Sequence, residues 1–456
     1  MEDLSAQLLP WNLYKRIAFR FAFIFFLLFI ILLDWSVNPV FSFLYYEGNL
    51  AQVLDGIVAW LGKHLFQISY TIVSPYDAQH NDRTYVYLLY FAMAAMAAIG
   101  TILWSVLDRK RTSYETAYYW LATIIRYYLA FTLFLFALEK FFKMQFPDPG
   151  LYTLTEPVGN LSPMSLAWAF FGHSYSYNIV IGIAESAALL LLFRRTMVFG
   201  AILTLGTLLN VIIVNFSYDV HAKMYPAVLF VMALFLVLPY VDRFIKFFFT
   251  NQATSLPPVH APVFRKRWVR ISKNVFKFLL IGCVIVFFIN DYVMSKQRRE
   301  NREMSKSQAG ISGIFDVTSF VVDKDTVEAG SPQRWNQIII GGSRERIRLQ
   351  GDSVAYMFVS VADRELLVYK SPKDLSANEQ EVFNEYGFSQ RTSSMLDSIL
   401  VSRQVMSKFQ FTVVDSATLV LQGTINHNPV SIEAKKRSIR REDFRLIKNG
   451  FHWITE

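Results

Sequence analysis

The amino-acid sequence predicts a membrane α-helical bundle followed by a soluble, mostly antiparallel β domain. Two observations predict this fold class. First, 53% of the residues are hydrophobic, 41 are Phe and the mean hydropathy is +0.30, which is too apolar for an ordinary soluble fold. Second, the long apolar runs lie before Asn290, whereas the residues after it alternate between polar and apolar types. The chain therefore combines a part suited to lipid with a part suited to water.

Six apolar segments are long enough to cross a bilayer, for which a helix needs about 20 apolar residues. They are residues 17–35, 84–107, 117–138, 174–193, 196–218 and 224–241. A seventh segment, 278–290, is short unless Lys273 and Lys277 extend their ammonium groups toward the headgroups. We therefore expect about seven spans.

Lys and Arg collect on alternate connections, which predicts the direction of each span. The basic groups are Lys15 with Arg16, residues 109–111, residues 194–195, and Arg243 with Lys246 and residues 265–277. They favour a cytoplasmic N-terminus, with the loops at 38–83, 145–173 and 219–223 outside. If the seventh segment crosses, the β domain is periplasmic. The basic run at 296–302 would then lie just outside the membrane, which is a contrary signal.

The chain divides into four expected parts. Residues 1–115 hold two spans and an outer interfacial helix at 50–66, where apolar residues recur at helical spacing. Residues 116–249 hold four spans, and residues 250–295 hold a Pro-rich basic linker and the last span. The soluble domain is 296–456.

Short alternating runs in the last part predict antiparallel strands. They are residues 311–320, 337–340, 344–349, 353–361, 366–369, 408–414, 418–423 and 430–433. Ser376 and Glu379 form a capping-box pattern, and Gly387 is suited to end the helix that it would begin. A barrel or a sandwich is expected.

Several function classes are disfavoured. The single cysteine, Cys283, allows no intrachain disulfide and no redox pair. The net charge of +9 comes from basic residues beside apolar segments, so membrane anchoring explains it without nucleic acid. The β domain has no phosphate loop or nucleophile elbow. A self-sufficient enzyme is thus the weaker expectation.

Charged residues inside apolar segments are the main functional signal, because each costs a few kcal/mol in lipid and tends to have a partner or a polar cavity. Arg126 and Lys140 fall on nearly one helix face. Asn215, Asp219 and Lys223 follow i, i+4 and i+8 spacing and would form one ridge if the helix continued. We expect a ligand-binding cluster at the outer mouth of the bundle, made of Arg126, Glu139, Lys140, Glu185, Asn215, Asp219 and Lys223.

Three interpretations of this cluster stay open. The charges form ion pairs that fix helix register, or they hold a substrate, quinone or proton. The third interpretation is a metal site built on His173, His221, Glu185 and Asp219. It is weaker, because the two histidines lack helical or short-loop spacing.

The same region carries a resemblance to a known family. The stretches are RYYLAFTLFLFALEKFFKMQFP (126–147), NLSPMSLAWAFFGHSYSYNIVIGIAESAALLLLFRRT (160–196), NVIIVNFSYDVHAK (210–223) and the closing GFHWITE (450–456). They resemble the DoxX-like membrane proteins, in particular the larger Bacteroidota-type forms. The chain departs from that pattern at Ala137 with Leu138 and at His221 with Ala222, while Glu185, Asp219 and Lys223 match it.

The resemblance implies a bacterial inner membrane, a four-helix core within 116–249 and, through some family members, a link to quinones. The first hypothesis is therefore a quinone- or electron-transfer-linked membrane subunit that binds an amphipathic ligand at the outer mouth. The alternative is a non-enzymatic scaffold whose periplasmic β domain docks an envelope protein. Transport has less support, because no inverted repeat is evident.

Overall fold

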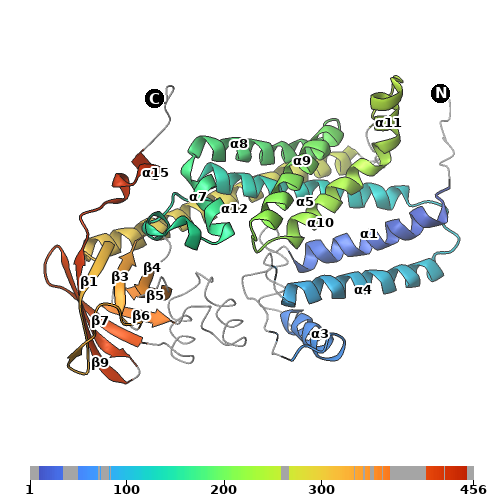
Figure 1. Ribbon diagram of the computed structural model, residues 1–456. Helices are drawn as coiled ribbons and strands as arrows, with labels where there is room; N and C mark the ends of the chain where they lie inside the picture. Colours follow the sequence, from blue (N-terminus) through green and yellow to red (C-terminus); the bar gives the residue numbers. More distant parts are fainter. Residues whose placement is uncertain are drawn as a thin grey trace. The chain divides into compact units, whose positions relative to one another are not determined.

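The computed structural model describes residues 10–33, 50–69, 72, 82, 84–257, 267–332, 334–341, 345–349, 354–361, 363–369, 407–425 and 427–448. It divides into two compact units, which are described separately (Figure 1). The helical unit contains Met1–Gln145 and Ser176–Phe287, and the β unit contains Phe146–Tyr175 and Phe288–Glu456.

Helices build the first unit. They are α1 (Leu13–Leu32), α3 (Leu50–His64), α4 (Thr84–Leu107), α5 (Glu115–Phe141), α8 (Tyr175–Ser186) with η2 (Ala187–Leu192), α9 (Met197–Ser217), α10 (Met224–Val237), η3 (Leu238–Tyr240) and α11 (Val241–Thr250). Helix α4 packs against α1 and α3, and α10 packs against α9 and α5. The helix expected at 50–66 is present as α3.

Among the described residues, five stretches are long and apolar enough to cross a membrane: α4, α5, α8 with η2, α9, and the run from Met224 to Thr250. They coincide with five of the predicted spans. Helix α1 has 20 residues but is not among these five, because Lys15, Arg16 and Arg20 lie within its first eight residues. The prediction of a membrane-type helical bundle is confirmed at this level. The seven-span count and the DoxX-like core stay predictions.

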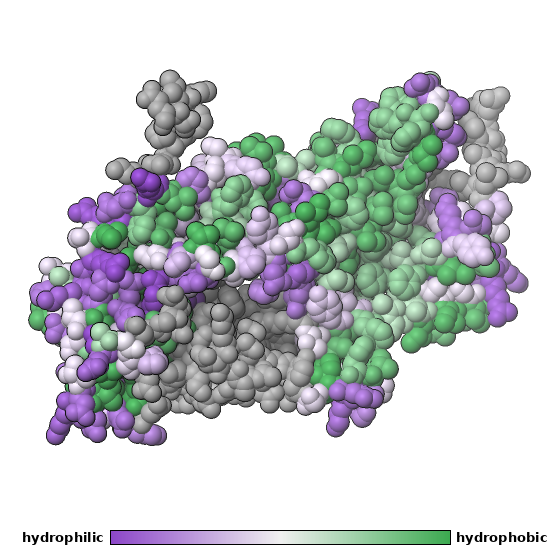
Figure 2. Space-filling view, in the orientation of Figure 1, coloured by the Kyte–Doolittle hydropathy of each residue, from purple (hydrophilic) through white to green (hydrophobic). Residues whose placement is uncertain are grey.

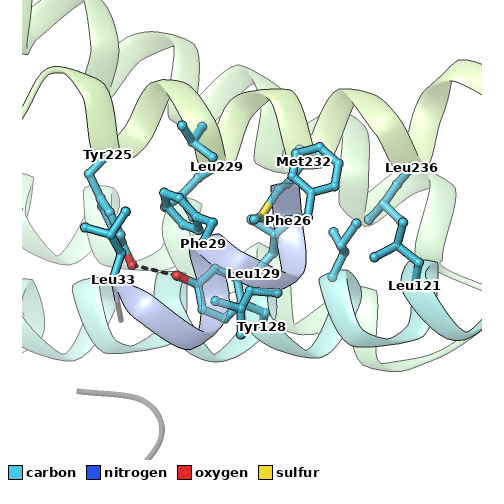
Figure 3. Close-up of a cluster of buried hydrophobic side chains, with 14 of the residues drawn as sticks. Phe26, Phe29, Leu33, Leu121, Tyr128, Leu129, Tyr225, Leu229, Met232 and Leu236 are labelled. Atoms are coloured by element: carbon cyan, nitrogen blue, oxygen red, sulfur yellow. Dashed lines mark hydrogen bonds between the residues drawn. The ribbon is translucent and has the colours of Figure 1, made fainter. Parts of the chain in front are cut away.

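The core of the helical unit is aromatic and aliphatic (Figure 3). Phe29 of α1 is fully buried and stacks on Tyr225 of α10 with ring centroids 5.6 Å apart. The hydroxyl of Tyr225 lies 3.2 Å from that of Tyr128 on α5. A buried hydroxyl without a partner is costly, so this pairing lets two tyrosines enter the core.

The outward surface of the bundle is also apolar. On α9, Phe199, Ile213 and Phe216 are all more than half exposed, and Figure 2 shows hydrophobic surface over α9 and α10. Water would penalise such a face, whereas hydrocarbon accepts it. This pattern fits a lipid-facing bundle.

Helix α12 is continuous over 42 residues, Arg267–Gln308. At 1.5 Å per residue it is about 63 Å long, roughly twice the hydrocarbon thickness of a bilayer. The predicted seventh segment, 278–290, lies inside it. Flanking turns extend the helix at both ends, but the apolar segment itself stays short, and its crossing of the membrane stays a prediction.

The β unit contains one antiparallel sheet. Its strands are β1 (Gly313–Val322), β2 (Asp325–Thr326), β3 (Trp335–Ile340), β4 (Glu345–Leu349), β5 (Val354–Ser360), β6 (Glu365–Tyr369), β7 (Ser407–Val413), β8 (Thr418–Ile425) and β9 (Asn428–Lys436). All eight predicted strands are present, and β2 is additional. The helix expected at 376–387 lies outside the described residues.

The strands follow one another in the order β1-β3-β4-β5-β6-β7-β8-β9, and β2 pairs with the end of β1. Strand β1 also pairs with β9, from Phe315 opposite Lys436 to Val322 opposite Val430. The ladder therefore returns to its first strand, as in an up-and-down barrel. Of the two architectures that the strand pattern allows, this pairing favours the barrel.

The inside of this sheet is filled by side chains. Trp335 packs on Phe409 with ring centroids 5.0 Å apart and on Phe320 at 5.9 Å. A Cβ atom at Gly423 would meet the Lys408 carbonyl oxygen and the Phe409 ring. Glycine at this position thus lets two neighbouring strands approach closely.

The described residues of the β unit also include the part of α12 from Phe288 onward and five short helices: α6 (Leu151–Thr155), η1 (Val158–Asn160), α7 (Pro163–His173), η6 (Arg441–Asp443) and α15 (Arg445–Lys448). The first three belong to the segment that joins α5 to α8 in sequence. Although the spans on either side of it belong to the helical unit, this segment packs with the sheet.

Candidate functional site

A buried ion pair joins two spans of the helical unit. Lys140 Nζ lies 2.8 Å from Glu185 Oε1, and the side chains are 5% and 1% exposed. The ammonium group also lies 5.2 Å from the centre of the Phe136 ring. Glu185 Oε2 is buried without a hydrogen-bond partner among the described residues. The pair is therefore charge-matched but leaves one acceptor unused.

Local packing brings the pair together. Asn178, Gly182 and Glu185 are the buried residues of α8 and lie on one face. A Cβ atom at Gly182 would lie 2.5 Å from the Phe141 ring on α5. Glycine therefore lets α8 approach α5 where Lys140 and Glu185 meet.

Arg126 of α5 has a separate role, at the end of the span formed by α8 and η2. Helix α8 gives way to the 3-10 helix η2 after Ser186, and Arg126 Nε donates a 2.7 Å hydrogen bond to the Leu191 carbonyl. Thr196 Oγ1 donates to the adjacent Leu190 carbonyl at 2.7 Å. These bonds satisfy carbonyl groups at a helix end, where intrahelical donors are missing.

The expected ridge of Asn215, Asp219 and Lys223 does not form as one helix face. Helix α9 ends at Ser217, and Asp219 adopts a left-handed conformation with φ of 48°. Asn215 Nδ2 instead donates to the Ala222 carbonyl at 2.7 Å. The condition for that ridge, a helix that continues past Ser217, is not met.

Lys223 still pairs with Asp219, at 2.8 Å from Nζ to Oδ1. This hydrogen bond lowers the pKa of Asp219 and raises the pKa of Lys223, because each charge stabilises the other.

A residue absent from the predicted cluster completes the turn. Asp82 accepts hydrogen bonds from the backbone N–H of Lys223 at 2.7 Å and of Met224 at 3.2 Å. Its carboxylate also lies 3.7 Å from Lys223 Nζ. Asp82 therefore acts as an N-cap for α10 although it is 141 residues away. No local sequence signal identifies it.

The remaining predicted residues lie at exposed positions. Glu139 and His221 are exposed in the helical unit, and His173 is the exposed last residue of α7 in the β unit. The described residues contain no group of three or more His, Cys, Asp or Glu side chains that could hold a metal ion.

The predicted cluster thus resolves into three sites within the described helical unit. Lys140 with Glu185 forms one site, and Arg126 with the Leu191 carbonyl forms the second. Asn215, Asp219 and Lys223 with Asp82 form the third. The first two sites share one role, which is to join two helices through matched polar groups.

The β unit holds a second charged contact that the sequence did not reveal. Arg348 Nη2 lies 2.8 Å from Glu156 Oε2, with the Glu156 side chain 3% exposed. Its Nη1 donates to Gln337 Oε1 at 3.0 Å. Arg348 therefore links the segment before α7 to the barrel wall.

Three neighbouring contacts reinforce this link. The Arg346 guanidinium lies 5.7 Å from the centre of the Tyr152 ring. Arg441 Nε donates to the Pro149 carbonyl at 3.2 Å, and Arg441 Nη2 lies 3.4 Å from Asp148 Oδ2. We name residues 146–175 the docking segment, because its first half contacts Arg346 and Arg348 of the barrel and Arg441 of η6.

Comparison with known proteins gives one relative. The chain is 34% identical over 119 residues to the uncharacterized protein YwoB of Bacillus subtilis (strain 168), a match that covers 26% of this chain and 74% of that protein. The chain belongs to the YwoB family. No family model matches, and no solved structure matches. Membership of the YwoB family assigns no activity to this chain. The DoxX-like assignment stays a prediction.

Proposed function

We propose that this chain is a non-enzymatic membrane scaffold. Its helices anchor a β barrel on the outer side of the bacterial cytoplasmic membrane, and its own docking segment holds that barrel. The contact between Glu156 and Arg348 carries this proposal. The five span-capable helices support the membrane anchor.

The chemistry of the contact supports a specific attachment. Burying a carboxylate costs several kcal/mol unless a matched partner and hydrogen bonds replace its water. Arg348 supplies the matched charge and donates to Glu156 Oε2 at 2.8 Å, and its guanidinium is positioned by a further bond to the Thr155 carbonyl at 3.3 Å. A guanidinium suits this role because its donors are fixed in one plane. Incidental surface ion pairs rarely reach this burial.

Connectivity supports the placement of the barrel. The docking segment follows α5, and three span-capable stretches separate it from α12. Three crossings would leave the start of α12 on the opposite side of the membrane from the docking segment. The barrel can meet the segment only if α12 adds a fourth crossing. The side of the membrane opposite the docking segment should be the cytoplasm, because it carries the basic residues at 109–111, 194–195 and 243–246.

Docking of an envelope protein extends this proposal. The barrel interior is filled by residues such as Trp335 and Phe409, so the outer surface is the part that offers a partner contact. Large exposed apolar side chains on the described strands and their turns are few, among them Val413 and Val414. We therefore expect a largely polar contact with the partner.

Charge reversal tests the scaffold contact in the full-length protein. Glu156→Arg and Arg348→Glu should each destabilise the protein by about 3–5 kcal/mol, because each leaves like charges in a confined site. The double variant should recover much of that loss. Unfolding is followed in detergent by intrinsic Trp fluorescence.

Lys408→Glu is the matched control. It reverses a surface pair with Glu365 at 2.8 Å in which Lys408 is 58% exposed, and it should cost no more than about 1 kcal/mol. If Arg348→Glu behaves like Lys408→Glu, or if the double variant recovers nothing, the docking contact does not hold the barrel.

A second candidate function is binding of an amphipathic ligand, such as a quinone, beside Lys140 and Glu185. The observation that favours it is Glu185 Oε2, which is buried without a hydrogen-bond partner among the described residues. Buried acceptors are usually satisfied, so an additional donor is expected there. The DoxX-like resemblance, with its link to quinones, belongs to this proposal.

Native mass spectrometry of the purified protein tests this candidate. A bound lipophilic molecule should be retained by the wild type and by Glu139→Gln, and lost from Glu185→Leu. If the wild type carries no such molecule, or if Glu185→Leu retains it fully, the ligand proposal fails.

A further inference from the structure

A pocket of about 140 Å³ lies where the start of α1 meets the end of α4. Its lining residues are Leu13, Arg16, Ile17, Arg20, Ser105 and Arg109. Three of the six are arginines, and two are aliphatic. We propose that this pocket binds the phosphate group of an anionic phospholipid.

The inner wall of the pocket is fixed in place. Arg20 is 2% exposed, and it donates to the Tyr114 hydroxyl at 2.7 Å and to Ser105 Oγ at 2.6 Å. Its Nη2 also donates to the Asp108 carbonyl at 3.2 Å. All these acceptors are neutral, so the Arg20 guanidinium is held rigidly without an ion pair of its own.

Among the described residues, positive charge exceeds negative charge around the pocket. Asp108 is one nearby carboxylate, and it already pairs with Arg111 at 3.3 Å and accepts from the Tyr114 hydroxyl at 3.0 Å. Glu115 accepts from Trp11 Nε1 at 2.7 Å. Arg16 and Arg109 have no ion-pair partner among the described residues. With Arg20 they leave the site in need of an anion.

One donor in the pocket is unused. Arg16 Nη1 donates to the Arg111 carbonyl at 3.0 Å, whereas Arg16 Nε is buried without a hydrogen-bond partner among the described residues. A buried N–H of a charged group without an acceptor is costly. Phosphate oxygens match the planar guanidinium fork, and two or more arginines can share one phosphate.

An apolar stripe favours a lipid over free phosphate. Leu13, Ile17 and Phe21 are four residues apart on α1, so they lie on one face. They are 55%, 40% and 36% exposed, and the stripe continues to Phe25, whose ring stacks on Phe21. It begins in the pocket and runs along the helix, as an acyl chain would. Basic pockets at the ends of spans are common headgroup sites.

Lipid titration of the full-length protein in detergent tests the proposal. Dioctanoyl phosphatidylglycerol is compared with inorganic phosphate by native mass spectrometry and by the shift in unfolding temperature. Arg16→Gln/Arg109→Gln should weaken phosphatidylglycerol binding by about tenfold or more, because charge-assisted hydrogen bonds to phosphate are lost. Lys110→Gln/Lys246→Gln removes the same charge outside the pocket and should bind like the wild type.

Two results would overturn the proposal. Equal losses in the two double variants would mean that only general charge attracts the lipid. Equal protection by inorganic phosphate and by phosphatidylglycerol would mean that the apolar stripe contributes nothing. Arg109→Gln alone provides a further test if the double variant unfolds. Because Arg109 is exposed, this replacement should weaken lipid binding without loss of fold.

Discussion

The Nζ atom of Lys140 lies 2.8 Å from Oε1 of Glu185, and the two side chains are 5% and 1% exposed. A charged pair thus joins α5 to α8 within an apolar bundle. Such a pair adds little net stability over a well-packed apolar pair, but a single buried charge without its partner is strongly unfavourable. The pair therefore specifies how the two helices meet.

Single and double replacements of Lys140 and Glu185 should differ in their effect on the free energy of unfolding. Lys140→Met or Glu185→Leu alone should lower the free energy of unfolding by about 3–5 kcal/mol, because each leaves one buried charge. The double variant should lose less than the sum. Unfolding temperatures in detergent provide the measurement, with exposed Glu139→Gln as the control. Additive losses would mean that the two groups are not coupled.

Gly182→Ala should destabilise the bundle by about 1–3 kcal/mol, because the new methyl group overlaps the Phe141 ring. Gly206→Ala is the matched control within span α9. A Cβ atom there meets nothing within 4 Å, so alanine should stabilise the helix by up to about 1 kcal/mol. The same unfolding measurement distinguishes the two. Equal effects would contradict close packing of α8 on α5.

Asp82→Ala should destabilise the start of α10 by about 0.5–2 kcal/mol, because the backbone N–H groups of Lys223 and Met224 lose their acceptor. Hydrogen exchange at the first turn of α10 should rise. Asp219→Ala removes only an exposed partner of Lys223 and should cost less than about 1 kcal/mol. If Asp219→Ala destabilises the protein more than Asp82→Ala does, Asp82 is not the carboxylate that caps α10.

The pair of Asp219 and Lys223 should give a defined pH dependence. The hydrogen bond from Lys223 lowers the pKa of Asp219, so its stabilisation is complete above the unfolded-state pKa of about 3.9 and is lost as the pH falls through the lower folded-state value. The difference in unfolding temperature between the wild type and Asp219→Asn should therefore be constant near neutral pH and shrink in acid. A difference that grows in acid would contradict the sign.

The elements of the fold were largely predictable from sequence, because periodicity and apolar length report on local environment. The spans 84–107 and 196–218 agree with α4 and α9 to within a few residues, and every predicted strand is present. Closure of the sheet was not predictable. It depends on pairing between β1 and β9, which are over a hundred residues apart, and no local pattern encodes such a contact.

The candidate site was predicted less well, for two physical reasons. Helical spacing placed Asn215, Asp219 and Lys223 on one face, but the chain turns after Ser217. The partners Asp82 and Glu156 lie 141 and 192 residues from Lys223 and Arg348, and neither stands within a long apolar run. Lys140 and Glu185 were identifiable because each interrupts such a run.

We propose that the docking segment and the barrel lie on the same, outer side of the membrane. Thiol labelling of intact cells with a membrane-impermeant reagent measures this placement. In a Cys283→Ser background, cysteines are placed at three exposed positions: Asn160→Cys in the docking segment, Ser438→Cys beyond β9, and Ser255→Cys after α11.

We expect Asn160→Cys and Ser438→Cys to react alike in intact cells, whereas Ser255→Cys should react only after permeabilisation. Labelling of Asn160→Cys and Ser438→Cys from opposite sides of the membrane would contradict it, because Glu156 and Arg348 could not then meet.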